Sequence, residues 1–248
     1  MAAMKAVGLI PARHAATRLP GKPLAPIAGV PMVRRVWEGA RGAHSLREVI
    51  VATDDERVAS ACRGFGARVA MTRSDHATGT DRLAEVAAGL DDEIIVNIQG
   101  DEPLVEGYVI DAAVAALEED PAVAMSTVVH PAEPEGLDDP NRVKVVLDRS
   151  DLALYFSRSR IPALRDAAAA PRYWQHVGLY AYRRAFLLEF VKLERTPLER
   201  AEALEQLRAM EHGHRIRCAK VEGWLGIPVD VPADVARVEA RLRELGRC

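Results

Sequence analysis

Short apolar runs alternate with helical patterns along the first hundred residues, and this alternation constrains the fold more than any other feature. The runs are Ala6–Ile10, Arg47–Thr53, Ala67–Met71 and Ile94–Ile98. Between them, Pro31–Ala40 carries apolar residues at helical spacing. Strand–helix–strand alternation indicates a parallel sheet with helices on both faces. We therefore predict an α/β fold in which the loops after the strands meet at one edge of the sheet.

A polar loop follows the first run and carries three cations, Arg13, Arg18 and Lys22. In open α/β sheets ligands bind beyond the carboxyl ends of strands, and arginine and lysine suit phosphate oxygens. The loop is not a Walker A motif and no GxGxxG follows the strand, which disfavours P-loop kinases and Rossmann dinucleotide sites. A polyphosphate site and a solvated basic turn are the two interpretations left open.

Two acidic residues are candidates for a metal site. Asp101 follows the Ile94–Ile98 run and so reaches the same edge as the cationic loop. Mg²⁺ takes one or two carboxylates and completes its shell with phosphates and water. The alternative is that Asp101, Glu102 and Pro103 simply make a turn before the next helix. Asp230 lies one position outside the cap of the helix predicted over Pro232–Leu245, which leaves its carboxylate free.

The second half of the chain changes character after the proline-rich segment Pro131–Pro140. Two strand patterns, Val143–Leu147 and Ala153–Ser157, flank a polar turn and predict an inserted hairpin that binds substrate. The strand predicted over Tyr173–Tyr182 places His176 and Tyr180 on one face.

His176 could be a structural histidine or, with Tyr180 and a nearby arginine, could line a sugar pocket. A single helix is predicted over Leu198–Glu211, with Glu205 and Gln206 opposite its apolar face. Composition alone assigns that face to solvent.

Charge and cysteine content exclude several classes. With 33 basic and 36 acidic residues the net charge is −3, which predicts no nucleic-acid or membrane partner. The three cysteines, Cys62, Cys218 and Cys248, lack the spacing of a metal site or a disulfide framework, which favours a cytoplasmic location. No apolar stretch approaches the ~18 residues of a membrane span, and the start of the chain lacks a signal-peptide pattern.

Several short motifs occur in a characteristic order over almost the whole length. They are Ile10–Leu24, Thr72–Leu83, Gln99–Pro103, Tyr155–Arg158, His176–Tyr180, Leu204–Arg208 and Val229–Asp230. In this order the chain closely resembles the 3-deoxy-D-manno-octulosonate (Kdo) cytidylyltransferases, or CMP-Kdo synthetases. The resemblance implies a glycosyltransferase-A-like nucleotidyltransferase fold, with a central mostly parallel sheet, helices on both faces and an inserted small sheet.

The resemblance also implies an activity. The enzyme would transfer CMP from CTP to Kdo for lipopolysaccharide biosynthesis and release pyrophosphate, with Mg²⁺ as cofactor and a homodimer formed partly by the inserted strands. Two alternatives are a cytidylyltransferase for another sugar acid and a non-catalytic nucleotide-binding regulator.

Family roles can be carried over residue by residue. CTP would contact Pro11, Ala12, Arg13, Arg18, Lys22, Arg73, Ser74, Gly79 and Gln99. The sugar acid would contact Arg158, His176, Tyr180, Glu205 and Gln206. The catalytic residues would be Arg13, Lys22, Asp101 and Asp230, of which Asp101 and Asp230 would hold the magnesium. The chain departs from the family pattern at Ala16, Val231 and Ala233, where the family usually has Ser, Thr and Glu.

These assignments divide the chain into three regions. Residues 1–131 are predicted to form a nucleotide-binding α/β core, and residues 132–222 a sugar-binding and dimerisation region. Residues 223–248 are predicted to return to the core.

Overall fold

The structure, a computed structural model, describes residues 6–15, 19–166 and 168–247. It divides into two compact units. Unit 1 contains residues 1–111 and 225–248, and unit 2 contains residues 112–224.

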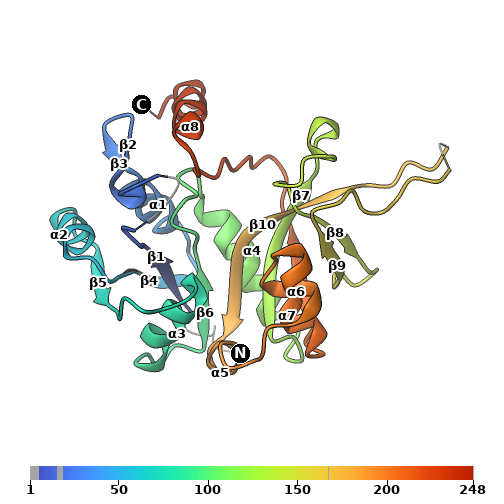
Figure 1. Cartoon of the computed structure of the whole chain (residues 1–248), viewed down its shortest axis with the longest axis horizontal. Helices are drawn as coiled ribbons and strands as arrows, with labels where there is room; N and C mark the ends of the chain where they lie inside the picture. The colour runs from blue at the N-terminus through green and yellow to red at the C-terminus, as the bar shows by residue number, and fades with distance from the viewer. Residues whose placement is uncertain (1–5, 16–18, 167, 248) are drawn as a thin grey trace. The chain divides into compact units, whose positions relative to one another are not determined.

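Unit 1 is built on a parallel sheet (Figure 1). Its strands are β1 (Ala6–Pro11), β4 (Leu46–Thr53), β5 (Arg68–Met71) and β6 (Ile94–Asn97). Its helices are α1 (Met32–Ala40), α2 (Glu56–Gly64), α3 (Gly79–Ala88) and α8 (Pro232–Glu244). The strand order is β6-β1-β4-β5, and each neighbouring pair is parallel. The predicted alternation is therefore confirmed.

The strand order reverses direction once in unit 1. From β1 the chain moves outward through β4 to β5, and then returns through α3 to β6 on the other side of β1. Right-handed crossovers place α1 and α2 on one face of the sheet and α3 on the other. The reversal creates a switch point between the carboxyl ends of β1 and β6, which is where α/β sheets bind ligands.

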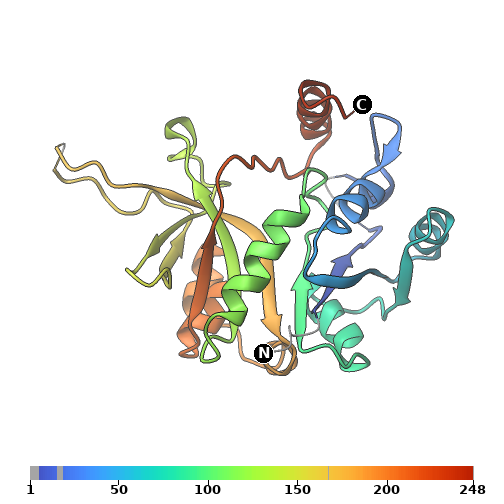
Figure 2. The same ribbon diagram turned by 180° about the vertical axis from the view of Figure 1, so that it is seen from behind.

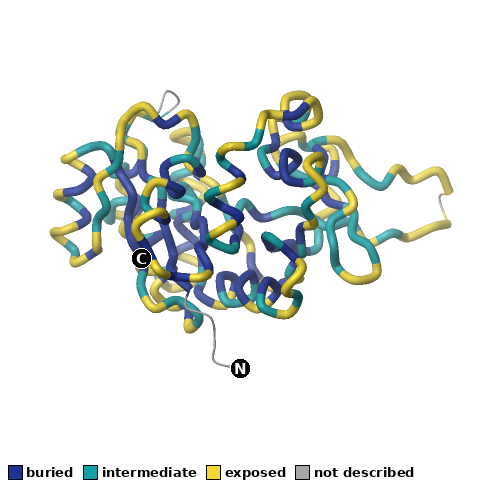
Figure 3. The backbone as a smooth tube through the Cα atoms, turned by 90° about the horizontal axis from the view of Figure 1, so that it is seen from below, coloured by how far each residue is buried: buried dark blue, intermediate teal, exposed yellow. Residues whose placement is uncertain are grey.

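Shorter elements follow the cationic loop and were not predicted. They are the 3₁₀ helix η1 (Lys22–Leu24) and the strands β2 (Pro26–Ile27) and β3 (Val30–Pro31), which form a separate antiparallel pair. A buried apolar cluster packs this segment against α8, and the buried stretches of the chain are dark blue in Figure 3. The cluster contains Ile27, Met32, Leu104, Val229, Val238 and Leu242. It brings residues near the end of the chain to the first loop.

Unit 2 is a mixed sheet with three short helices (Figure 2). Its strands are β7 (Met125–Pro131), β8 (Lys144–Leu147), β9 (Ala153–Ser157), β10 (Trp174–Arg183) and β11 (Ile216–Lys220). Its helical segments are η2 (Pro134–Gly136), α5 (Arg184–Phe190), α6 (Pro197–Glu202) and α7 (Gln206–Glu211), and α4 (Gly107–Glu118) spans the boundary between the units. β7 pairs with β11 in parallel and with β10 antiparallel, and β8 and β9 form the predicted hairpin.

Two features differ from the sequence expectations. The helix predicted over Leu198–Glu211 was wrong, because Ala203 adopts a left-handed conformation (φ 51°) and separates α6 from α7. Unit 2 begins at residue 112, not at 132, because β7 pairs with β10 and β11.

A buried hydroxyl links β4 to the loop after β1. Thr53 is fully buried, and its Oγ1 donates to the carbonyl oxygen of Ala12 at 2.7 Å. In Thr53→Val the carbonyl loses this partner, and we expect the stability of unit 1 to fall by about 1–3 kcal/mol. Urea unfolding measures the change. The exposed Ser60→Ala on α2 is the control, and an equal effect of both substitutions would contradict the assigned role of Thr53.

Candidate active site

A cavity of about 420 Å³ lies at the switch point of unit 1. Its lining comes from the loops after β1, β5 and β6 and from Asp230, near the end of the chain. The lining residues are Pro11, Ala12, Arg13, Ala15, Leu19, Lys22, Pro23, Ala77, Thr78, Gly79, Arg82, Gln99, Gly100, Asp101 and Asp230.

Lys22 joins two carboxylates in this cavity. Its Nζ lies 2.8 Å from Oδ2 of Asp101 and 3.1 Å from Oδ1 of Asp230. Burial alone would lower the pKa of Lys22, but the two carboxylates outweigh burial and raise it above its ordinary value. The loops thus supply one ammonium and two hard oxygen donors at one point, as the sequence predicted for Asp101.

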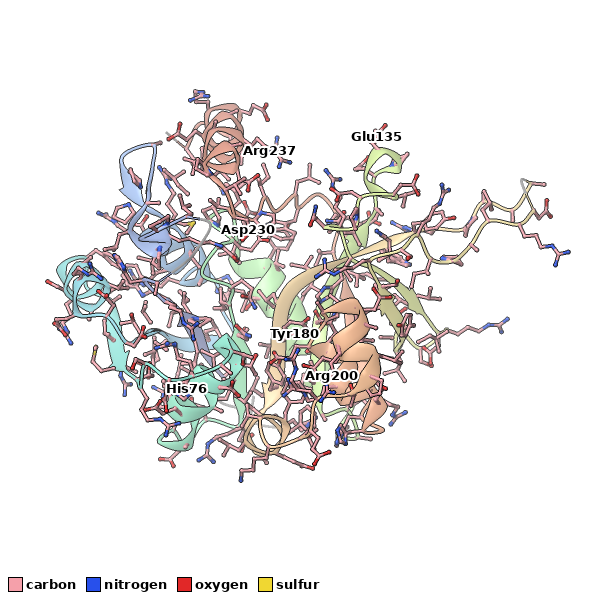
Figure 4. The ribbon with its side chains drawn as sticks, in the orientation of Figure 1. His76, Glu135, Tyr180, Arg200, Asp230 and Arg237 are labelled. Atoms are coloured by element: carbon pink, nitrogen blue, oxygen red, sulfur yellow. The ribbon has the colours of Figure 1, made fainter. Side chains whose placement is uncertain are left out.

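Backbone contacts hold the two aspartates together. The Val229 N–H donates to the carbonyl oxygen of Asp101 at 2.9 Å. The carboxylate of Asp234 accepts the N–H of Asp230 and of Val231, at 3.0 and 3.1 Å. Val231 is the N-cap residue of α8, and Asp230 comes directly before it. The carboxylate of Asp230 is therefore not used as the cap, and Asp230, labelled in Figure 4, lines the cavity.

Glycine is required where the loop after β6 passes β1. A Cβ on Gly100 would lie 2.6 Å from the carbonyl oxygen of Pro11, closer than side-chain atoms approach. The absence of a side chain lets the loop that carries Asp101 approach the cationic loop.

Glu102 is a partly buried acid with a buried Oε2 atom, and it was not predicted as a site residue. Its Oε2 has no hydrogen-bond partner among the described residues. Burial, together with the negative charge of Asp101, raises its pKa to about 8. The raised pKa favours the uncharged form of Glu102 beside the negative charge of Asp101. The turn-forming role considered from the sequence gave no sign of this burial.

The loop after β5 forms another wall of the cavity. Arg13 donates from Nη2 to the carbonyl oxygen of His76, and Arg82 donates from Nη1 to the Thr72 hydroxyl. Arg82 is 1% exposed and lines the cavity, and it was not predicted as a site residue. Its only sequence signal was its place in the Thr72–Leu83 motif.

The predicted CTP contacts divide into three groups. Pro11, Ala12, Arg13, Lys22, Gly79 and Gln99 line the cavity. Arg73 and Ser74 are exposed and lie outside the lining of the cavity. The backbone N–H of Arg73 donates to the carboxylate of Glu85 at 3.2 Å. Arg18, like Ala16, lies outside the described residues.

The donor set fits a magnesium ion. No group of three His, Cys, Asp or Glu side chains within the described ranges forms a metal cluster. Mg²⁺ nevertheless needs only one or two carboxylates when phosphates and water complete its shell. Asp101 and Asp230 are already held together by a cation, the Lys22 ammonium, which shows that their oxygens can share a positive charge.

The predicted sugar residues lie in unit 2, and a row of aromatic rings connects several of them. Ring centroids are 5.3 Å apart between His176 and Tyr180, 5.9 Å between Tyr180 and Tyr182, and 6.2 Å between Tyr182 and Phe190. A bulge in β10 leaves the first three residues on one face, as predicted, and Figure 4 labels Tyr180 on this strand. The pKa of Tyr180 is raised, mainly by burial and secondarily by the negative charge of Glu205.

Gln206 and Arg158 carry donors suited to a ligand. Gln206 is 4% exposed, and its Nε2 has no hydrogen-bond partner among the described residues. The Arg158 guanidinium donates to the carbonyl oxygens of Pro140, Glu202 and Ala203. No carboxylate of the described chain forms an ion pair with it, so its charge is available to an external anion.

The parallel sheet, the cavity at its switch point and the lysine–carboxylate cluster are features of a nucleotidyltransferase. A family model for cytidylyltransferases matches residues 7–216. Two relatives named 3-deoxy-manno-octulosonate cytidylyltransferase, from Syntrophotalea carbinolica and Myxococcus xanthus, are both 51% identical. Their alignments cover 98% and 99% of this chain and 100% of each relative. The chain belongs to the 3-deoxy-manno-octulosonate cytidylyltransferase family, as the motifs predicted.

Solved structures agree with the fold. A structure of CMP:2-keto-3-deoxy-manno-octonic acid synthetase complexed with CTP superposes with a TM-score of 0.92 and 44% identity. The superposition covers 97% of this chain and 99% of the synthetase chain. A 4-diphosphocytidyl-2C-methyl-D-erythritol synthase from Anaerococcus prevotii, at 11% identity and a TM-score of 0.65, shares the fold alone. The predicted nucleotidyltransferase fold is confirmed.

Burial of His176 predicts how stability depends on pH. Burial, and secondarily the charge of His130, lowers the pKa of His176 below its ordinary 6.5. Below about pH 6.5 the unfolded chain therefore binds a proton that the folded chain does not, so stability falls as pH falls. We expect thermal denaturation between about pH 7.5 and about pH 5.5 to show a smaller loss of stability for His176→Gln than for the wild type. The exposed His212→Gln is the control and should keep the wild-type slope, and an unchanged slope for His176→Gln would contradict the assignment.

Proposed function

We propose that this protein transfers CMP from CTP to Kdo, giving CMP-Kdo and pyrophosphate for lipopolysaccharide biosynthesis. The observation that carries the proposal is the contact of Lys22 with Asp101 and Asp230 inside the cavity at the switch point. The family and the CTP-bound relative support the same substrates.

The cavity of unit 1 suits the triphosphate of CTP. Arg13 and Lys22 line it with two cations, and Gly79 and Gln99 form further parts of its wall. On nucleotide binding, the Lys22 ammonium can neutralise phosphate oxygens, since it already compensates negative charge at this position. Arg18, Arg73 and Ser74 stay predicted CTP contacts.

Unit 2 suits an anionic sugar. The Arg158 guanidinium has neutral carbonyl partners and no ion pair within the described chain, which supports a role in pairing with the sugar carboxylate. His176, Tyr180, Glu205 and Gln206 offer donors and acceptors for the hydroxyl groups of the sugar.

The reaction is an in-line displacement at phosphorus. The anomeric hydroxyl of Kdo attacks the α-phosphorus of CTP and releases its proton to solvent. A new C–O–P linkage forms, and the bond to the oxygen of the departing pyrophosphate breaks. Arg13 and Lys22 would neutralise the charge that develops on the phosphates, and the sugar residues would align the hydroxyl. Asp101 and Asp230 would hold Mg²⁺, which when bound supplies positive charge to the phosphates and lowers the pKa of the attacking hydroxyl.

Two further assignments are proposals of the same kind. A homodimer formed partly by β8 and β9 is supported by Leu154, an apolar side chain on β9 that is 58% exposed. For location, the structure offers one finding: none of the described helices combines the length and the apolar character needed to cross a bilayer.

A pyrophosphate-release assay tests the function. We expect release with CTP, Mg²⁺ and Kdo, and weaker release when a sialic acid or an amino-modified octulosonic acid replaces Kdo. Greater activity with one of these acids would move the assignment to a different cytidylyltransferase. CTP binding without release from any sugar acid would favour a nucleotide-binding regulator and overturn the proposal.

Asp101→Asn tests the proposed role of the cluster. The substitution keeps the shape of the side chain but removes a charge that would hold the metal, so kcat should fall by roughly 10²-fold or more. Asp91→Asn, at an exposed position after α3, is the control and should keep the wild-type rate. Near-normal turnover of Asp101→Asn would refute the metal assignment.

A further inference from the structure

A buried ion pair in unit 2 contacts one of the predicted sugar residues, Glu205. Glu199 on α6 and Arg208 on α7 have side chains that are 3% and 6% exposed. Two parallel hydrogen bonds join them: Arg208 Nε donates to Oε2 of Glu199 at 2.8 Å, and Nη2 donates to Oε1 at 2.7 Å. The paired geometry is specific to the planar guanidinium and fixes α6 against α7.

Arg208 also reaches Glu205. Its Nη2 lies 3.6 Å from Oε1 of Glu205, a carboxylate that is 30% exposed. The guanidinium carbon lies 4.9 Å from the ring centre of Phe190, the last ring of the row that begins at His176. Arg208 thus contacts one predicted sugar residue, Glu205, and the Phe190 ring at the end of the aromatic row.

The charges in this region alternate. On the surface side, Arg195 Nε donates to Oε1 of Glu199 at 3.0 Å. The sequence of charges is therefore Arg195 positive, Glu199 negative, Arg208 positive and Glu205 negative. Of these groups Arg208 is the cation in contact with Glu205, so the carboxylate of Glu205 has a positive neighbour although it would face a substrate that is itself an anion.

We propose that the Glu199–Arg208 pair positions Glu205 and Gln206 and compensates the charge of Glu205, so that this subsite accepts a sugar acid. The inference rests on the proposed function and deepens it. The break at Ala203 supports it, because Glu205 is the N-cap residue of α7 and Gln206 its first residue, and both follow the break and need an anchor beyond it. The buried Nε2 of Gln206, which has no partner among the described residues, is the donor that this anchor would hold ready.

Three variants separate positioning from folding. Arg208→Met removes the two guanidinium hydrogen bonds of the buried Glu199, which keeps its contact with Arg195, and it removes the positive charge beside Glu205. Thermal stability and Kdo affinity should therefore both fall. In the double variant Glu199→Gln/Arg208→Met no buried charge is left unpaired at this pair, so thermal stability should largely recover. The double variant also lacks the Arg208 charge beside Glu205, so Kdo affinity should stay low. Arg208→Lys keeps the charge without the paired geometry and is a milder variant that keeps the test available if Arg208→Met fails to fold.

The measurement is calorimetric titration of each protein with Kdo, together with KM values for Kdo and CTP. We expect Arg208→Met and the double variant to bind Kdo at least about tenfold more weakly, and Arg208→Lys about threefold more weakly, with KM for CTP within about twofold of the wild type. The loss of Kdo affinity in Arg208→Met relative to the wild type should be smaller at high salt, because salt screens the repulsion between Glu205 and the sugar carboxylate.

The outcomes are distinguishable. Recovery of both stability and Kdo affinity in the double variant, or equal rises in both KM values, would overturn the inference and leave the pair a structural one. Failure of the wild type to bind Kdo would also overturn it. Kdo binding by the wild type without pyrophosphate release would instead refute the proposed function and leave the inference in place.

Discussion

The contact between one lysine and two carboxylates organises the site in unit 1. Lys22 is 79 positions from Asp101 and 208 positions from Asp230 in the chain, yet its ammonium lies within 3.1 Å of both. The ammonium offsets the repulsion between the two carboxylates that it contacts. Because Lys22 provides this positive charge, the protein can present two oxygen donors and a cation to the same nucleotide. The parallel sheet, Gly100 and the cluster that packs α8 all serve to maintain this arrangement.

In the proposed function, unit 2 binds a second anionic substrate, the sugar acid. A sugar acid has hydroxyl groups, which acceptors such as Glu205 can bind, and a carboxylate, which such an acceptor repels. Arg158 offers a charge without a protein counter-ion, and Arg208 compensates Glu205 from behind. The two arginines therefore have different proposed roles. Arg158 would bind an external anion, whereas Arg208 is paired with carboxylates of the protein itself.

Much of this could be predicted from the sequence, and the failures have physical causes. Apolar runs predicted β1, β4, β5 and β6. Because the carboxyl ends of parallel strands meet at one edge of the sheet, the position of Asp101 after β6 predicted that it lies near the cationic loop. The break at Ala203 could not be seen, because the apolar spacing at Ala201, Leu204 and Leu207 continues across it with a helical period. The burial of Glu102 and the Glu199–Arg208 pair depend on tertiary packing, which residue order does not encode locally.

The central claim is that Asp230 and Asp101 act together on one metal-bound nucleotide. Titration with Mn²⁺ in the presence of CTP, followed by water-proton relaxation, tests it directly in the wild type and in Asp230→Asn. We expect a CTP-dependent Mn²⁺ site in the wild type, with an affinity at least about tenfold lower in Asp230→Asn. Equal Mn²⁺ affinity in the two proteins would contradict the account, because Asp230 would then have no part in the site.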